Sequence, residues 1–430
     1  MMVRPTTIAA KTSTAQMIPD NHALVLVLTI AYLPAESCAV FYSLHKCLPQ
    51  PLMARMIQSR FVFYKKVDQM RKSLTTLATF ILLAGGVGDG VKAQSGSGSC
   101  DRACLENFVD RYLDAVIAHN PKLLPLARNV KFTENGVKLE IGDAHWKTVI
   151  GKGKYRIFVA DPEAGEVAFI GTVREEARGP EGILTALALR LKIENRQISE
   201  IETLLIRSTV PNGRRGEPPA APTGAAVNME RLGTPHHLFA ETVPPAERMS
   251  RGDLIKIANM YFSGMEKNDG KGVYPFTDDC NRIENGSLST NVPVREGDTR
   301  PDPKTAGSYS ANWGCKEQFE SGLIHFVWRI RDRRFVAVDQ ERGLVFSFAF
   351  FDHALGSDRT FQTPVGRTVT GGPPDPWTWQ LAEMFKVEKG KIRQIEAVLQ
   401  RVPYGMSSGW SSWEDGLSSA ARDVTKSGSR

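Results

Sequence analysis

Two segments of the chain carry apolar side chains at the spacing of an amphipathic helix. The stripe in residues 105–117 consists of Leu105, Phe108, Val109, Tyr112, Leu113 and Val116. The stripe in residues 254–265 consists of Leu254, Ile257, Ala258, Tyr261 and Met265. Residues three and four apart share one helix face, so the pattern predicts two helices that each pack one face against a core.

Short apolar runs of strand length follow each helix. They occupy residues 156–160, 166–173 and 184–193 in the first half, and 323–330, 343–353 and 377–387 in the second. The segment FKVEKGKIRQIEAVLQRV predicts a hairpin with a tight Lys-Gly turn. Helices that precede a run of strands, rather than alternating with them, predict an α+β fold.

Three stretches of the first half recur, in the same order, in the second half. Phe-Thr-Glu-Asn-Gly at 132–136 corresponds to Arg-Ile-Glu-Asn-Gly at 282–286, an offset of 150. VADPEAGEVAF corresponds to AVDQERGLVFS, and KIENRQISEIETLLIR to KVEKGKIRQIEAVLQR, with offsets of 178 and 194. The growing offset predicts one domain present twice, with insertions of 28 and 16 residues in the second copy.

These matches define the expected domain organisation. The two domains are expected at 94–210 and 248–410, with a Pro/Gly-rich linker at 211–247 and a flexible tail at 411–430. The insertions lie around 287–315 and 355–376. Because long loops in compact domains are often functional, both insertions suit lids over a binding site.

Most of the net charge of +7 lies in the N-terminal part of the chain. Residues 1–93 hold ten Lys and Arg against four Asp and Glu, whereas residues 94–430 hold 44 against 43. The balanced charge of the larger part argues against a nucleic-acid-binding protein.

Residues 70–93 have the order of a secretory signal peptide. A basic start (MRKS) precedes a short apolar run and a Val-Lys-Ala end, which predicts cleavage after Ala93. We therefore expect a secreted or periplasmic protein with no membrane segment after cleavage. Residues 1–69 form an uncertain extension, and Met70 is an alternative start. The apolar run at 23–33 is a rival signal or anchor, but nothing after it resembles a cleavage site.

Four of the six cysteines follow residue 93, an even number that suits disulfides in an exported chain. Cys280 and Cys315 bracket the first insertion and are expected to pair. Cys100 and Cys104 pair with each other or with another partner. Neither a zinc-site spacing nor a Gly-rich phosphate loop is found in the sequence, so we expect no metal and no cofactor.

The segments FVDRYLDAVIAHNPKLLPLARNVKFTENG and NMYFSGMEKND…NRIENG resemble the nuclear transport factor 2-like superfamily, which includes SnoaL-like cyclases and ketosteroid isomerases. The resemblance implies two cone-shaped domains, each with helices packed on a strongly curved, mostly antiparallel sheet around an apolar pocket. It also implies a helix tyrosine and a late-strand acid that stabilise an enolate, with an Asp that moves the proton.

The resemblance transfers these roles only in part. The helix tyrosine matches Tyr112 and Tyr261, and the late-strand acid matches Glu383 in the second copy but a leucine, Leu189, in the first. The proton-moving Asp matches Asn135 in the first copy and Asn285 in the second. An asparagine cannot act as a general base. Each asparagine follows a glutamate, Glu134 or Glu284.

Three residues are candidates for the missing base: Glu284, Asp352 and His353. Successive strand residues point to opposite faces, so only one of the last two can face a pocket, and Asp352 is preferred. Each Glu-Asn-Gly also predicts a turn, since Asn-Gly favours left-handed backbone angles. Asn285 lies in an Asn-Gly-Ser glycosylation sequon as well.

The remaining candidates are aromatic or basic. The cluster RIRDRRF at 329–335, beside Trp328, could hold an acidic ligand, although an exposed strand with alternating charges is the commoner explanation. Trp313, Trp377 and Trp379 in or beside the insertions suit either ligand stacking or packing between domains.

The pattern as a whole predicts a mainly structural first domain and a ligand-binding second domain. We expect a small apolar or aromatic molecule to bind near Tyr261, Asn285 and Glu383, with cofactor-free isomerase, dehydratase, cyclase or lyase chemistry. Trp328 and His353 are further candidate contacts, as are Tyr112 and Asn135 in the first copy. The alternative is a non-catalytic binding or interaction module, and a dimer is left open.

Overall fold

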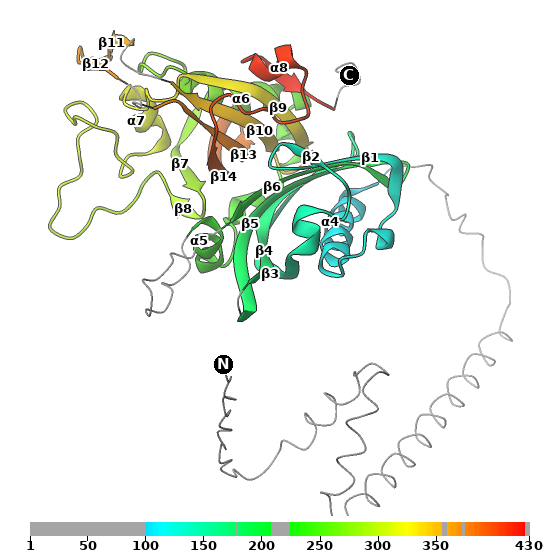
Figure 1. The fold of residues 1–430 in the computed structure, drawn as a ribbon. Coiled ribbons are helices and arrows are strands. Elements are labelled where there is room, and N and C mark those ends of the chain that lie inside the picture. Colours follow the sequence, from blue (N-terminus) through cyan, green and yellow to red (C-terminus); the bar gives the residue numbers. More distant parts are fainter. Residues whose placement is uncertain (1–99, 178, 208–223, 355–358, 372–374, 426–430) are drawn as a thin grey trace, which may run out of the picture. The chain divides into compact units, whose positions relative to one another are not determined.

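The computed structural model describes residues 100–177, 179–207, 224–354, 359–371 and 375–425 (Figure 1). All of them belong to one compact unit, Ser95–Arg430. The predicted signal peptide at 70–93 and the extension at 1–69 lie outside the described residues. Within the described part of the chain, no helix is long and apolar enough to cross a membrane.

The first repeat runs from helix α4 to strand β6. Its elements are α4 (Arg102–Ile117), η3 (Pro121–Leu123), β1 (Leu126–Glu134), β2 (Val137–Leu139), η4 (Ala144–Lys147), β3 (Val149–Asp161), β4 (Glu166–Ala177), β5 (Gly179–Glu194) and β6 (Gln197–Arg207). The Asp101 carboxylate caps α4 by accepting a hydrogen bond from the backbone N–H of Cys104. The six strands form one sheet in the order β2-β1-β6-β5-β4-β3, in which only β1 and β6 pair in parallel.

The second repeat has the same order of elements, with additions. They are α5 (Ala225–Leu232), η5 (His237–Phe239), η6 (Pro245–Glu247), α6 (Arg251–Met265), β7 (Phe276–Glu284), β8 (Ser287–Leu288), α7 (Cys315–Glu320), β9 (Arg329–Asp339), β10 (Leu344–His353), β11 (Thr360–Gln362), β12 (Thr368–Thr370), β13 (Trp377–Glu388), β14 (Lys391–Val402), α8 (Trp413–Leu417) and β15 (Ala421–Asp423). Its main sheet has the order β15-β9-β10-β13-β14-β7-β8. Without β15, this is the topology of the first sheet, so the α+β class and the tandem repeat are confirmed.

Tight turns close the corresponding hairpins of the two repeats. Asn195 and Arg196 join β5 to β6, and Lys389 and Gly390 join β13 to β14, all with positive φ angles between 50° and 74°. Two successive residues of positive φ form the turn whose twist matches a hairpin. The predicted Lys-Gly hairpin is confirmed.

One predicted strand is wrong. Residues 323–328 form turns and irregular backbone, and strand β9 begins at Arg329. The apolar side chains of this run, including Ile324 and Val327, are nevertheless buried in the core of the second repeat. Burial on an irregular segment produces the same apolar run as a strand, so periodicity could not separate the two.

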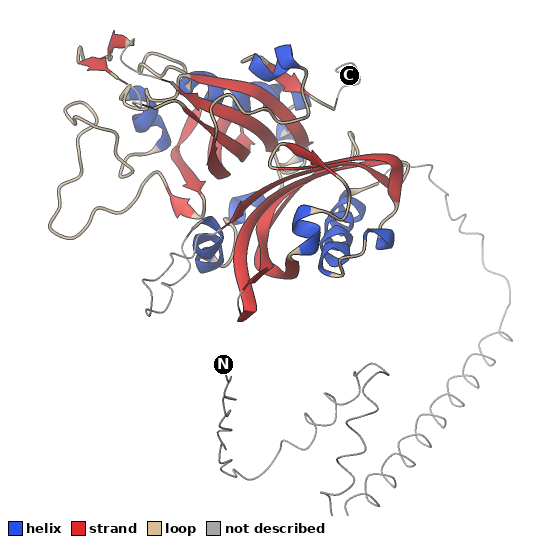
Figure 2. Ribbon diagram, viewed as in Figure 1, coloured by secondary structure: helices blue, strands red, loops and turns tan. Residues whose placement is uncertain are grey.

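Each sheet packs one face, here called the inner face, against its helix, as Figure 2 shows for α4. In the first repeat Phe169, Leu187 and Leu189 lie in one apolar cluster with the α4 stripe. In the second, Leu381 and Phe385 cluster with α6. The two helices and their apolar stripes are therefore as predicted.

The opposite, outer faces of the two sheets pack against each other. Ile170 and Leu204 of the first sheet share one buried cluster with Phe346 and Ala382 of the second. Helix α5 adds Ala225, Ala226 and Met229 to this cluster. Residues 225–247, expected to belong to a linker, therefore include a packed helix.

Buried polar pairs also join the two outer faces. The Arg334 guanidinium donates to both carboxylate oxygens of Glu202, at 2.8 and 2.6 Å. The Tyr155 hydroxyl donates to Glu396 at 2.6 Å. Residues 331–334 are buried, so the interpretation of RIRDRRF as an exposed charged strand is wrong. Arg334 takes its carboxylate partner, Glu202, from the first repeat, whereas Arg331 and Arg333 pair with Asp352 and Glu266 of the second repeat.

The described part of the C-terminal tail, residues 411–425, packs on the second repeat, whereas the sequence predicted a flexible tail. Strand β15 pairs in parallel with β9, and the Asp423 carboxylate accepts from Arg251 at 2.9 Å. The indole N–H of Trp410 donates to the Thr133 hydroxyl at 2.8 Å, and the Lys131 ammonium lies 3.9 Å from its ring centroid. Trp410, immediately before the tail, thus joins the second repeat to the first.

Replacing Trp410 by alanine should lower the free energy of unfolding by about 2 kcal/mol, because the half-buried ring, one hydrogen bond and a cation–π contact are lost together. Trp413→Ala is the matched control, since that side chain is 75% exposed; it should change stability by less than about 0.5 kcal/mol. Urea unfolding of both variants measures the difference. If both replacements lower the free energy of unfolding equally, the contacts of Trp410 with the first repeat do not stabilise the protein.

Candidate functional site

Three of the residues predicted for the second repeat meet on its inner face. Tyr261 projects from α6 and is 1% exposed, and Glu383 on β13 is 2% exposed. Glu284 ends β7, and its charge acts on Glu383. Strand β13 alternates its side chains, so Glu383 shares the inner face with Leu381 and Phe385.

Arg282 also belongs to this cluster, and sequence reasoning missed it. It is 3% exposed and donates to the Tyr261 hydroxyl at 3.4 Å and to the Gln318 side-chain oxygen at 2.9 Å. It further contacts the Tyr309 hydroxyl at 3.0 Å and pairs with Glu284 at 3.3 Å. In the repeat alignment Phe132 of the first copy matches Arg282 of the second. This replacement of an apolar residue by an arginine is the sequence feature that could have identified Arg282.

Burial dominates the electrostatics of the cluster. Desolvation and the charge of Glu284 raise the pKa of Glu383 to about 8, against the opposing effects of Arg282 and Tyr261. Burial likewise raises the pKa of Tyr261 well above its usual value. One oxygen of Glu383, Oε2, has no hydrogen-bond partner among the described residues. At neutral pH the site therefore presents a protonated carboxyl group, a phenol and a guanidinium.

The first insertion covers this cluster. It supplies Tyr309, and α7 supplies Gln318 and Phe319; the Phe319 ring lies 5.4 Å from that of Tyr261, centroid to centroid. The predicted Cys280–Cys315 disulfide is confirmed and joins the first residue of α7 to β7. The second disulfide joins Cys100 to Cys104.

The two asparagines of Glu-Asn-Gly have matching structural positions. Asn135 has φ 52° and Asn285 φ 51°, as the turn prediction requires. Each side-chain amide exchanges two hydrogen bonds with one backbone residue of the neighbouring strand: Asn135 with Leu205 and Asn285 with Leu399. Both amides are thus engaged in fixing the end of the first strand.

The structure does not bring the other predicted residues to the cluster. Asp352 lies directly opposite Thr378 of β13. Thr378 is five positions from Glu383, and because side chains alternate along a strand, Thr378 and Asp352 lie on the outer face. There it accepts from Arg329 and Arg331 at 2.6 and 2.8 Å. The preference for Asp352 over His353 as the inward-facing residue is therefore wrong, and the reason is the strand register.

His353 faces inward but lies at the far end of β10. It stacks on Trp377 at 3.7 Å between ring centroids, and burial lowers its pKa to about 4. Trp379 packs edge-on against both rings. Trp328 lies under the Lys267 ammonium, and Trp313 is buried with its indole N–H donating to Pro301.

The first repeat holds a different polar cluster on its inner side. Tyr112, matching Tyr261, contacts the His145 ring through an O–Nε2 distance of 2.8 Å. His145 Nδ1 lies 2.9 Å from Glu134, which accepts from Arg207 at 2.8 Å. Sequence analysis gave His145 no role, because a single histidine 11 residues from Glu134 and 33 from Tyr112 matches no motif spacing.

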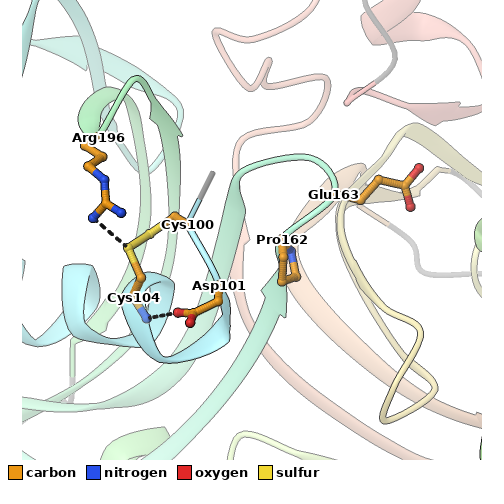
Figure 3. A pocket seen from close by; sticks show the side chains of 6 residues that line it. All are labelled: Cys100, Asp101, Cys104, Pro162, Glu163 and Arg196. Atoms are coloured by element: carbon orange, nitrogen blue, oxygen red, sulfur yellow. Dashed lines mark hydrogen bonds between the residues drawn. A yellow bond between two sulfur atoms is a disulfide. The ribbon is translucent and has the colours of Figure 1, made fainter. Parts of the chain in front are cut away.

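A surface pocket of about 470 Å³ lies away from both clusters, at the start of α4. Figure 3 shows it lined by the Cys100–Cys104 disulfide, Asp101, Pro162, Glu163 and Arg196. Among the described residues, no group of three or more His, Cys, Asp or Glu could hold a metal ion.

Comparison with known families gives a match over residues 99–205 and 247–399, together 260 of the 430 residues. The matched family is described as a domain of unknown function, DUF8021. The chain belongs to the DUF8021 family. The two matched DUF8021 segments coincide with the two repeats of the structure. A search of curated proteins finds no match.

Proposed function

We propose that this DUF8021 protein is exported and binds a small apolar or aromatic molecule on the inner face of its second repeat. The convergence of Tyr261, Arg282 and Glu383 under α7 carries this proposal. Small-molecule sites are mostly apolar and contain a few convergent polar groups with shifted pKa values. The two disulfides favour an oxidising compartment.

We further propose that both repeats are cones of the nuclear transport factor 2-like type. The shared topology, with one helix on the inner face of a largely antiparallel sheet, supports this assignment. In such a cone, the ligand lies between the helix and the sheet, where Tyr261 and Glu383 meet.

The cluster suits a ligand with a carbonyl group. Protonated Glu383 and Tyr261 can each donate a hydrogen bond to the carbonyl oxygen and so stabilise negative charge that develops there. The Glu284 carboxylate can then take a proton from the neighbouring carbon, which leaves an enolate. Return of that proton to another carbon completes an isomerisation. If the enolate instead expels a β-hydroxyl group, which takes the proton held by Glu284 and leaves as water, the result is a dehydration.

Side chains of α7 cover the cluster, and a movement of α7 would open it to a ligand. Phe319 lies against Tyr261, Tyr274 and Phe276, and Gln318 holds Arg282. The Cys280–Cys315 disulfide keeps the first residue of α7 attached to β7. Displacement of the Phe319 ring would make room for a ligand ring in the same aromatic surroundings.

A non-catalytic scaffold is the second candidate. It is favoured by the packing of Phe276, Phe319 and Phe385 around Tyr261, which fills the inner side with the protein's own rings. In this alternative the buried carboxyl group of Glu383 binds no ligand.

Thermal-shift screening of the chain against steroids, polyketides, phenolics and sugar acids tests the proposal. A ligand at 100 times its dissociation constant should stabilise the protein by about 2.7 kcal/mol. Glu383→Leu, which copies Leu189 of the first repeat, should abolish that stabilisation. Glu388→Leu, at the turn end of the same strand, should retain it. If no compound stabilises the wild-type protein, or if both variants respond alike, the scaffold alternative stands.

A further inference from the structure

The surface pocket at the start of α4 has a disulfide in its wall. The pocket has a volume of about 470 Å³, and both Cys100 and Cys104 line it (Figure 3). Cys104 is half-buried, whereas Cys100 is 4% exposed and packs into the core of the first repeat. A small molecule in the pocket therefore reaches an S–S bond, and the sulfur of Cys104 is the more accessible of the two.

The second disulfide of the chain lacks this access. Cys280 and Cys315 are 1% and 2% exposed and belong to the core of the second repeat. They are 35 positions apart in sequence, whereas Cys100 and Cys104 are four apart. Because a disulfide that closes a longer loop stabilises the fold more, the Cys100–Cys104 bond contributes the smaller share to stability. Exposed disulfides are also the ones that exchange readily, so the two bonds suit different roles.

Two positive features lie at the Cys104 sulfur. Cys104 is the third residue of α4, in the first turn, where the helix dipole is positive. The Arg196 Nη1 atom lies 4.0 Å from Cys104 Sγ, and Arg196 forms no ion pair with any described residue. The acidic groups of the pocket are Asp101, whose carboxylate caps α4, and Glu163. A guanidinium and a helix N-terminus together favour a thiolate at this sulfur.

We propose that Cys100–Cys104 is a reactive disulfide that exchanges with a small thiol bound in the pocket. The thiolate, attracted by Arg196, attacks the Cys104 sulfur and forms an S–S bond with it, while the bond to Cys100 breaks. Cys100 leaves as a thiolate and takes up a proton from water.

A second thiolate completes the reaction. It attacks the sulfur of the bound small molecule, which leaves as one small disulfide, and Cys104 is released as a thiolate beside Arg196. Two small thiolates are oxidised, the protein disulfide is reduced by two electrons, and one proton is consumed. This site is independent of the ligand proposed for the second repeat.

Reaction of the full chain with free cysteine tests this proposal. Free thiols are alkylated with N-ethylmaleimide in denaturant after increasing times, and tryptic peptides are mapped by mass. Trypsin cleaves after Arg102, so Cys100 and Cys104 fall into separate peptides. In the native chain both should become labelled while Cys280 and Cys315 stay paired. In the unfolded chain both disulfides should react, which shows that the fold produces the selectivity.

Variants of Arg196 test the assigned electrostatic role. Arg196→Gln should slow the exchange about two- to fivefold, the effect of one exposed charge, and Arg196→Lys should recover most of the rate. Arg231→Gln removes an exposed arginine of α5 and should react as the wild type does. Thermal unfolding checks that each variant is folded. A Cys100–Cys104 bond that stays closed in the native chain, equal rates for both disulfides, or an unchanged rate in Arg196→Gln would each overturn the proposal.

Discussion

The free energy of unfolding should fall as the pH rises from about 4.5 to 8, and Glu383→Gln should remove a large part of that fall. Burial raises the pKa of Glu383 in the folded chain to about 8 from 4.5. The folded state therefore binds a proton that the unfolded state has lost. The stabilisation is complete below the unfolded pKa and is lost as the pH passes through the folded value.

The magnitude is large because the group is fully buried. A shift of this size corresponds to roughly 3–5 kcal/mol between the two ends of the range. Urea unfolding of the wild type and of Glu383→Gln at a series of pH values gives the difference curve. Glu396→Gln is a second comparison, because burial raises the pKa of Glu396 to about 7. The difference in unfolding free energy between the wild type and Glu396→Gln should therefore stop changing at a lower pH than the difference for Glu383→Gln. Parallel curves for the wild type and Glu383→Gln would show that the carboxyl group is not held protonated.

Replacing Glu202 by alanine should destabilise the protein by about 3–5 kcal/mol. The side chains of Glu202 and Arg334 are 6% and 3% exposed and form two hydrogen bonds across the outer faces. Removal of the carboxylate leaves a buried guanidinium without its main counter-charge, and this desolvated charge accounts for most of the loss. Chemical denaturation of the variant measures it.

A double replacement identifies the cause. Glu202→Leu combined with Arg334→Met removes both charges and keeps apolar volume, so it should recover most of the stability. Glu320→Ala breaks an ion pair whose partners are both 51% exposed and should change stability by less than about 1 kcal/mol. If the double variant is as unstable as Glu202→Ala, lost packing rather than unpaired charge is responsible.

Several features of the site were open to sequence reasoning because their signals are local or repeated. Tyr261 belongs to a helical stripe, and Glu383 matches the late-strand acid of the family that the sequence resembles. Comparison of the repeats also shows that Leu189 replaces Glu383 in the first copy. The face taken by Glu383 was not decided by its alternation with Leu381 and Met384, and its place beside Tyr261 was expected only from the resemblance to the nuclear transport factor 2-like superfamily. In the structure both side chains lie on the inner face.

The sequence by itself determined the duplication, the α+β class, the two helices, the closing hairpins and the Cys280–Cys315 pair. Each depends on periodicity, turn chemistry or a bracketed insertion, all of which are properties of short segments. The tertiary structure alone decided that Asp352 faces outward, that Arg334 is buried against Glu202, and that His145 stands between Tyr112 and Glu134. These facts depend on strand register and on the packing of one outer face on the other, which bring together side chains that no local pattern relates.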